Sequence, residues 1–477
     1  MKHRILLPAI AALLLAGCGS GDDPAIRSDE REVGADQHPQ LLAAFGGAYE
    51  APEAAYVRRI GEKVAAAADL EGQCTFTLVN SDVVNAFAVP GCYIYVTRGM
   101  MAIVNSEGEL AAVLGHELGH IVGAHSRRQQ RRSIWRSLGV LAVGLVTGSE
   151  RLTRLAAGAA EFFTLRYSRS QEYEADDLGV RYLAASGYDP HAAADMLDAL
   201  GRNEQFVART RGRDEARGMP EWARTHPLAG NRVERATKAA SETGNAPDSL
   251  PENEAAYLAE VDGLLYGDDP QQGFVLGRRF AHPVMRIGFE APAGFTLTNS
   301  PQALQIEGPD GTRGEFGAGK MPAGGLEAYA SALLAQLLGD VQAKIGGGER
   351  RVVNGVEALV VPASVQTERG TAEIKVAVYA GGGTAYHLIA AAQPSASSRA
   401  AVEALIGSFR RLSEAEAAGL RPRTVRTVAV APGETAAAIA RRMASDHPLD
   451  HFLMLNARPA DAPLRPGDRV KIVVWIR

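Results

Sequence analysis

The stretch that decides the fold is HELGHIVGAH, residues 116–125, which places three histidines close together. On a helix, residues four apart share a face, so His116 and His120 point their imidazoles at one place. Glu117 lies beside them, able to reach a water molecule held there. This H-E-x-x-H order is typical of zinc hydrolases, in which the glutamate serves as general base.

The segment around the motif is predicted to be a buried helix. Ser106 and Glu109 form a capping box just before an apolar run at helical spacing that includes Leu110, Leu114 and Leu118. Two idle histidines would be costly on a buried helix, because buried polar groups need partners. Metal binding gives both histidines a partner.

A zinc site needs a third protein ligand, and His125 is poorly placed for it. At 100° per residue, His125 lies about 140° around the helix from His120 and about 180° from His116. The metzincin pattern would require a histidine at position 126, where the chain has Ser126. We therefore expect His125 to be a packing or surface residue, or to support a ligand from behind.

A better ligand lies in YSRSQEYEADDLGVRY, residues 167–182. Glu172 and Asp176 are four apart on a second predicted helix and share a face. This spacing suits a zinc-ligating Glu172, with Asp176 orienting a ligating imidazole. Taken alone, such an acidic stretch is more often a solvated helix face.

Three separated motifs, HELGHIVGAH, SRSQEYEAD and NAFAVPGCYIYVTRGM, resemble the CAAX-prenyl-endopeptidase and heat-shock-type family of zinc peptidases. The resemblance covers about residues 40–240 and is to the periplasmic lipoprotein branch. It implies a mainly helical zincin domain with a small β-sheet and one Zn²⁺ per chain. By the family pattern the ligands are His116, His120 and Glu172, Asp176 is their partner, and Glu117 is the catalytic base.

The resemblance implies two further assignments. Asn85, Ala86, Phe87 and Ala88 match a strand beside the cleft, where substrate would bind as an added extended strand. His226, in a Thr-His-Pro motif followed by Arg232, matches a motif near the active site. His226 could stabilise the oxyanion or occupy the open zinc position and hold the enzyme latent. The plainer alternative is a histidine at a helix start.

The N-terminus indicates export. A charged start and a short apolar run lead to Leu15-Ala16-Gly17-Cys18, which resembles a bacterial lipoprotein signal. The resemblance implies cleavage before Cys18, lipidation of that cysteine and, with Gly19 following, residence at the outer membrane. A plain secretory signal is the alternative. We predict a signal peptide over residues 1–17 and a polar tether over residues 18–40.

Two further cysteines bear on the fold. In an oxidising compartment the pair Cys74 and Cys92 is a disulfide candidate, with two buried free thiols as the alternative. The family usually reads Pro-Gly-Gly where this chain has Pro-Gly-Cys92, which is compatible with that bridge but leaves the shape of the cleft open.

The sequence predicts an α+β multidomain protein. After a peptidase domain over residues 41–240 we expect a linker over 241–281 and an α+β domain over 282–412, with a faint PsbP-like resemblance and no role that we can assign. Residues 425–477 read strand, helix, helix, strand and resemble a LysM module. That resemblance implies contact with peptidoglycan, although a structural cap that binds no glycan is as compatible.

Charge and hydropathy exclude other classes. The net charge of -5 in 477 residues argues against a nucleic-acid-binding protein. The most apolar internal run, residues 138–146, is short against the roughly 20 residues of a spanning helix.

The sequence therefore predicts an exported, lipid-anchored zinc endopeptidase that cleaves unfolded or misassembled envelope proteins in the periplasm near peptidoglycan. Two alternatives remain. One is a non-enzymatic or latent envelope chaperone or peptidoglycan-tethering lipoprotein, against which the intact Glu117 counts. The other is a zinc peptidoglycan amidase.

Overall fold

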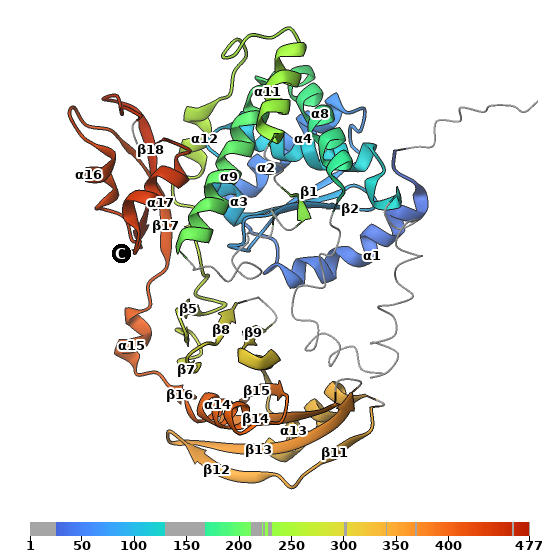
Figure 1. Ribbon diagram of the computed structural model, residues 1–477, viewed down its shortest axis with the longest axis vertical. Helices are drawn as coiled ribbons and strands as arrows, with labels where there is room; N and C mark the ends of the chain where they lie inside the picture. The colour runs from blue at the N-terminus through green and yellow to red at the C-terminus, as the bar shows by residue number, and fades with distance from the viewer. Residues whose placement is uncertain are drawn as a thin grey trace, which may run out of the picture.

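The computed structural model describes residues 25–128, 167–210, 231–299, 303–339, 341–367, 370–459 and 462–476, together with residues 222 and 225–227. The predicted signal peptide, Cys18 and the apolar run 138–146 lie outside the described residues. Figure 1 shows a mainly helical part at one end of the molecule, a β-rich part at the other, and the C-terminal module beside the helical part. The predicted α+β architecture is confirmed. Among the described helices, none is both long and apolar enough to cross a membrane.

The helical part is built around a small sheet and one buried helix. Its elements are α1 (Ser28–Ala44), α2 (Pro52–Ala67), β1 (Thr75–Val79), β2 (Ala86–Val89), β3 (Tyr93–Thr97), α3 (Arg98–Ile103), α4 (Glu107–Val122), α8 (Arg169–Ala185), α9 (Ala192–Thr210), α11 (Arg232–Glu242) and α12 (Glu254–Glu260). The sheet has the order β1-β3-β2, so β2 is an edge strand. The motif helix α4 packs against α2, α8, α9 and β2, and it is buried from Glu107 to His120.

The start of α4 follows the predicted capping signal. The Ser106 hydroxyl accepts a hydrogen bond from the Glu109 N–H at 2.9 Å, and the Glu109 carboxylate accepts one from the Asn105 N–H at 2.9 Å. These bonds satisfy amide groups that a helix start leaves without partners. The helix that carries the histidine motif is therefore fixed at its N-terminus by its own sequence.

Helix α1 takes up part of the predicted tether of residues 18–40. Leu41 and Phe45 form a buried cluster with Tyr95 of the central sheet, so α1 is packed against the helical part. The tether prediction does not hold for residues 28–40, because the apolar residues at the end of α1 bring the whole helix onto the sheet. The polar composition of its first turns had suggested otherwise.

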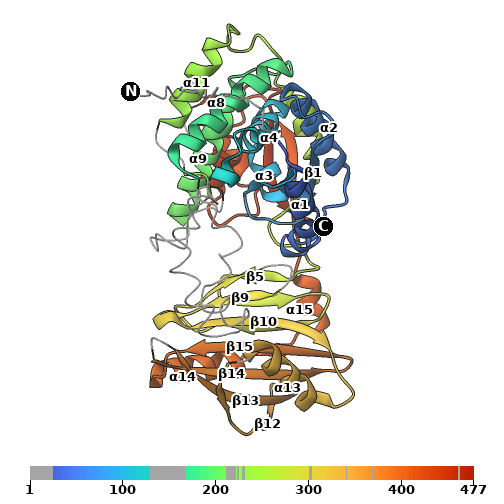
Figure 2. The ribbon, with the colours of Figure 1, turned by 90° about the vertical axis from the view of Figure 1, so that its right-hand side faces the viewer.

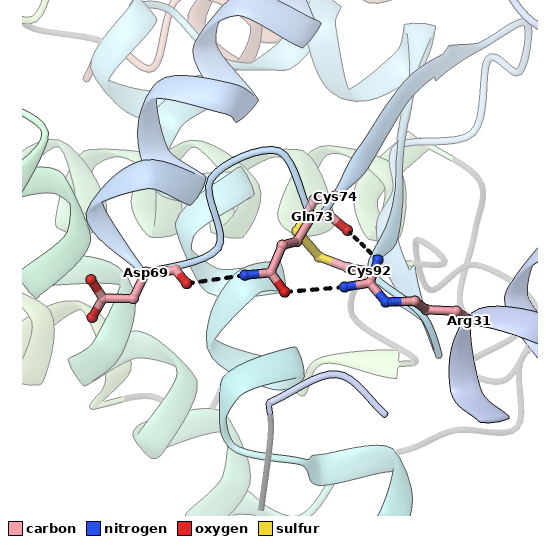
Figure 3. Close-up of a disulfide and its surroundings, with 5 residues drawn as sticks. All are labelled: Arg31, Asp69, Gln73, Cys74 and Cys92. Atoms are coloured by element: carbon pink, nitrogen blue, oxygen red, sulfur yellow. Dashed lines mark hydrogen bonds between the residues drawn. A yellow bond between two sulfur atoms is a disulfide. The ribbon is translucent and has the colours of Figure 1, made fainter. Parts of the chain in front are cut away.

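A disulfide joins the residues that directly precede two neighbouring strands of the small sheet, β1 and β3. Cys74 and Cys92, the pair predicted to bridge, are bonded to each other (Figure 3). Cys74 directly precedes β1 and Cys92 directly precedes β3, and the Thr75 N–H donates to the Cys92 carbonyl at 2.8 Å. Cys92 has a φ of 63°, a conformation that favours glycine, which is the residue that the resembled family usually has at this position.

We expect the double substitution Cys74→Ser and Cys92→Ser to lower the free energy of unfolding by about 3 kcal/mol, because the bridge closes a loop of 18 residues in the unfolded chain. Urea denaturation of the oxidised protein and of the variant measures the difference. The variant and the wild type treated with reductant should unfold at the same urea concentration. Equal stability of the oxidised protein and the variant would refute this expectation.

The β-rich part lies within residues 274–411. Its strands are β5 (Phe274–Leu276), β6 (Arg279–His282), β7 (Ile287–Glu290), β8 (Thr296–Thr298), β9 (Leu304–Glu307), β10 (Arg313–Lys320), β11 (Ala343–Ile345), β12 (Glu349–Val353), β13 (Val356–Thr367), β14 (Gly370–Gly381), β15 (Thr384–Ala392) and β16 (Arg410–Arg411). The large sheet has the order β11-β13-β14-β15-β10-β9-β8, with β12 paired to β13. Helices α13 (Gly325–Leu338) and α14 (Ala396–Gly407) cover its opposite faces (Figure 2).

The C-terminal module has the predicted order of strand, helix, helix and strand: β17 (Arg423–Ala429), α16 (Ala436–Ala440), α17 (Pro448–Leu455) and β18 (Arg469–Trp475). Its sheet has a third strand, β4 (Leu265–Tyr266), from the predicted linker of residues 241–281. The β-rich part is therefore inserted between two strands of one sheet. The linker prediction does not hold for α12 and β4 to β6, which are structured.

This module is docked on the helical part. Lys471 of β18 is fully buried, and its ammonium donates to the carbonyls of Ala102, Ile103 and Val104 at 2.8, 3.1 and 2.7 Å. These carbonyls end α3 and have no partner within the helix. Apolar residues of α9 and of the module share one buried cluster. The C-terminal module is thus part of the body that holds α4, not a freely moving arm.

Candidate metal centre

Two helices and one short segment bring the site together. Helix α4 carries His116, Glu117 and His120, and α8 carries Glu172. The helices approach closely because Gly119 faces the backbone of Ala175, where an added Cβ would lie 2.8 Å from the Ala175 carbonyl oxygen. The motif's glycine is therefore needed to bring the carboxylate of α8 to the histidines of α4.

Four ligand atoms converge on one point. One ligand atom from each of His116, His120, Glu172 and His226 lies within 4.8 Å of the others, and all four residues are buried. The His116 and His120 Nε2 atoms are 3.0 Å apart, and His226 Nδ1 lies 3.2 Å from His116 Nε2 and 3.1 Å from a Glu172 oxygen. Such mutual approach of nitrogen and oxygen atoms suits ligands of one ion.

The ring nitrogens that face away from this point have their own partners. His116 Nδ1 lies 2.9 Å from Asp176, and His120 Nδ1 lies 2.7 Å from His125 Nδ1. His125 is fully buried and its other nitrogen lies 3.3 Å from Glu174. Partners of this kind fix the orientation of ligating imidazoles. His125 therefore supports His120 from behind, which is one of the roles predicted for it, and it lies outside the ligand cluster.

Arg232 contacts two carboxylates of α8, those of Glu172 and Asp176. Its guanidinium donates to Asp176 at 2.7 and 2.8 Å and lies 2.9 Å from Glu172. Burial alone would raise the pKa of Asp176, but Arg232 and His116 hold it down, to about 2. Burial likewise acts against ionisation of Glu172, yet the neighbouring His226, His116 and Arg232 keep its pKa below the ordinary value. Both groups are therefore carboxylates at neutral pH.

Glu117 has a different environment. Its carboxyl group is buried, and one of its oxygens has no hydrogen-bond partner among the described residues. Burial raises its pKa to about 7, with Glu172 adding to the effect and His116 opposing it. Such a pKa suits a group that takes and returns a proton near neutral pH.

The residues present fit a zinc ion. Burial lowers the pKa of His120 well below its ordinary value, so the ring is neutral and can offer a lone pair. Imidazole nitrogens together with an ionised Glu172 make the nitrogen and oxygen donor set that zinc prefers. A pair of buried imidazole nitrogens only 3.0 Å apart also gains a shared partner when an ion lies between them.

The predicted substrate strand lies against this site. Ala86, Phe87 and Ala88 belong to β2, and the Ala88 N–H donates to the Glu117 carboxylate. Asn85, just before β2, is fully buried, and both polar atoms of its side chain lack a partner among the described residues. An edge strand with buried unpaired polar groups can pair with an added chain.

Two aromatic residues that the sequence analysis did not single out complete the site. Trp222 stacks on His226 with ring centroids 4.3 Å apart, and its backbone N–H donates to the Val84 carbonyl at 3.3 Å. Tyr167 stacks on His120 at 3.9 Å. Trp222 and Tyr167 are buried, so the segment with His226 covers the centre. The only signal for them in the sequence was their position just before the SRSQEYEAD and Thr-His-Pro motifs.

Comparison with known proteins agrees with this geometry. Residues 51–240 match the family model described as Peptidase family M48. This segment is similar to the peptidases of that family. This match agrees with the predicted zinc metallopeptidase, and the buried cluster within the matched segment is consistent with one zinc ion.

Relatives of known name match part of this chain. The chain is 29% identical to a beta-barrel assembly-enhancing protease of Yersinia pestis over 275 residues, which are 55% of this chain and 54% of that protein. It is 34% identical to the mitochondrial metalloendopeptidase OMA1 of Arabidopsis thaliana over 139 residues, which are 29% of this chain and 28% of that protein. The chain thus spans about half the length of the first relative and less of the second.

The comparison with solved structures also found a distant similarity. The cyanobacterial PsbP of Synechocystis sp. PCC 6803 covers 29% of this chain and 98% of its own, with 13% identity and a TM-score of 0.24.

Proposed function

We propose that this protein is an endopeptidase that cleaves unfolded or misassembled polypeptides of the cell envelope. The observation that carries the proposal is the meeting of His116, His120 and Glu172 beside Glu117 and the edge of β2. A relative's name as a beta-barrel assembly-enhancing protease supports an envelope substrate.

The proposed chemistry assigns each side chain one task. His116, His120 and Glu172 would hold the zinc ion, which when bound polarises the scissile carbonyl and makes water a stronger nucleophile. Glu117 accepts the proton of the attacking water and delivers it to the leaving amine. Asp176 and His125 keep the two imidazoles in place through their outer nitrogens.

The proposed substrate is an extended chain. Antiparallel pairing of β2 with β3 uses the backbone groups of Phe87, so those of Ala86 and Ala88 point to the free edge. A substrate segment can add to that edge as a strand only if it is locally unfolded. We therefore expect folded proteins to resist cleavage.

Casein hydrolysis by the mature chain tests this function. A zinc chelator should lower the rate by about 100-fold or more, and added Zn²⁺ should restore it, because the water and the carbonyl both need the ion. Cleavage that survives removal of all zinc would contradict the metal mechanism. No cleavage of casein under any condition would favour a latent or non-enzymatic envelope protein.

His226 would regulate access. With His116, His120 and Glu172, it supplies a fourth ligand atom, and four ligands complete the tetrahedral geometry that zinc prefers in closed sites. We expect His226→Ala to raise casein cleavage about tenfold by increasing the competent fraction. The exposed His447→Ala is the matched control and should have no effect. A loss of activity in His226→Ala would instead support stabilisation of the oxyanion.

The remaining location assignments also belong to the proposal. Cys18 would carry the lipid anchor at the outer membrane, facing the periplasm, and the C-terminal module with the order of a LysM domain would contact peptidoglycan. This module also favours the second candidate, a zinc peptidoglycan amidase. Release of stem peptides from purified sacculi, compared with casein cleavage, distinguishes the two enzymes.

A further inference from the structure

The first described residues are fixed to the catalytic part rather than hanging free. Ile26 is buried in the same core cluster as the residues of α4, and the Ala25 carbonyl accepts a hydrogen bond from Arg127 at 3.5 Å. Arg127 also lies 3.4 Å from Glu30 of α1. The chain is thus held from residue 25 onward.

Helix α1 keeps these residues beside the turn that ends β2. A Cβ added to Gly34 would lie 2.2 Å from the Pro90 carbonyl oxygen, and one added to Gly91 would lie 2.7 Å from the Glu30 carbonyl oxygen. Arg31 reaches across to Gln73 at 3.0 Å, next to the disulfide (Figure 3). The start of α1 and the end of β2 therefore form one rigid unit.

This unit borders the centre itself. A small cavity lies between the N-terminal residues Ala25 and Ile26, the turn at Pro90 and Gly91, and His120 of the centre. A chain added along the free edge of β2 leaves that strand at Pro90 and Gly91, beside this cavity. Ala25 and Ile26 thus lie near the point where a substrate chain added to β2 would leave the site.

The reach of the tether follows from chain geometry. The step from Cys18 to Ala25 is seven residues (25 − 18), which span about 25 Å at full extension. We propose that the lipid anchor holds the end of β2 at Pro90 and Gly91 next to the membrane, so that the substrates are unfolded chain segments lying at the membrane surface. This inference rests on the proposed peptidase function and on the proposed lipid at Cys18.

The anchor would therefore select substrates by their distance from the membrane and not by the identity of their side chains. A segment that trails from a protein inserting into the membrane lies within reach, and a segment held far from the surface does not. If residues 18–40 had all been a flexible tether, the reach would have been about 80 Å and no such restriction would follow. The packing of α1 on the sheet is what shortens it.

Reconstitution of the lipidated full chain in vesicles of phosphatidylethanolamine and phosphatidylglycerol provides the test. A casein-derived peptide that the protein cleaves is attached to a maleimide lipid through 4 or 20 prolines, spacers of about 12 and 60 Å. We expect cleavage of the near peptide to be at least about fivefold faster, because effective concentration falls steeply beyond the reach of a tether. Thirty Gly and Ser residues inserted between Asp22 and Asp23 should reduce this ratio to below about twofold. At full extension they lengthen the tether by about 100 Å.

The same thirty residues inserted between Gly382 and Gly383, in the exposed turn between β14 and β15, are the matched control and should leave the ratio unchanged. Equal cleavage of the near and far peptides by the wild type would overturn the inference, and so would a mature protein whose mass shows no lipid on Cys18.

Failure of the proposed function is recognised separately, because the same peptide free in solution would then not be cleaved. In that case energy transfer from a dye on the exposed position Glu32→Cys to a lipid-borne acceptor measures the distance without catalysis. Transfer that is strong with the native tether and falls with the lengthened one supports the inference, and equal transfer in both overturns it.

Discussion

Glu117→Gln should lower casein cleavage by about 10²- to 10⁴-fold, the range for loss of a general base. The native carboxyl group is buried beside the cluster and has a pKa raised to about 7, so it can hold the proton of water and then release it. An amide of the same shape can still accept the Ala88 N–H but has no basic oxygen at this pH. Zinc content should stay at one ion per chain, because Glu117 is not among the ligand atoms of the cluster.

Metal analysis by mass spectrometry and thermal unfolding accompany the rate measurement. Glu62→Gln, which makes the same change on the exposed face of α2, should cleave casein as the wild type does. A zinc-loaded, folded Glu117→Gln protein with more than about a tenth of the wild-type rate would contradict the role of general base. Loss of zinc from the variant would instead show that Glu117 helps to hold the ion.

The local part of this centre could be read from the sequence. The spacing of His116, Glu117 and His120 on one helix, and of Glu172 and Asp176 on another, fixes which side chains share a face. Helical periodicity and the capping signal located α4 because those signals depend only on neighbouring residues. Predictions of this kind needed no knowledge of how the two helices pack.

His125 shows where such reasoning stops. Its position was calculated for a helix that continues past His120, but α4 ends at Val122 and Ala124 has a φ of 49°. This left-handed residue turns the chain back, and His125 meets the outer nitrogen of His120 at 2.7 Å. A helical wheel cannot represent a chain reversal, so the predicted angle between His125 and His120 was wrong. A supporting role for His125 was one of the predicted alternatives, and the contact with His120 agrees with it.

Long-range pairing was the second limit. Lys471 meets α3 across 369 residues of sequence, and β4 pairs with β17 although the β-rich part lies between them. Neither contact leaves a periodic pattern, because each depends on the whole fold. From composition alone, residues 241–281 were therefore predicted to be a linker. For the C-terminal module, the sequence did not distinguish glycan binding from a structural cap.

Arg232→Ala should lower the free energy of unfolding by about 3–5 kcal/mol, the cost of removing one partner from a buried ion pair. Arg232 is 1% exposed and is the cation that faces both Glu172 and Asp176 in the described part of the chain. Without it, two buried carboxylates lie together against α11. Zinc affinity should also fall about 10- to 100-fold, as is usual when a residue that positions ligands is lost.

Arg235→Ala, one turn further along α11, is the matched control. Arg235 lies 3.2 Å from Asp177, but both side chains are more than a third exposed, so water screens the pair. We expect this substitution to change the free energy of unfolding by less than about 1 kcal/mol. Urea denaturation of both metal-free variants measures the difference, and zinc titration of both measures affinity. Equal effects of the two substitutions would show that Glu172 and Asp176 do not depend on the buried cation, and the carboxylates would then have to be neutralised by protons or by the metal ion alone.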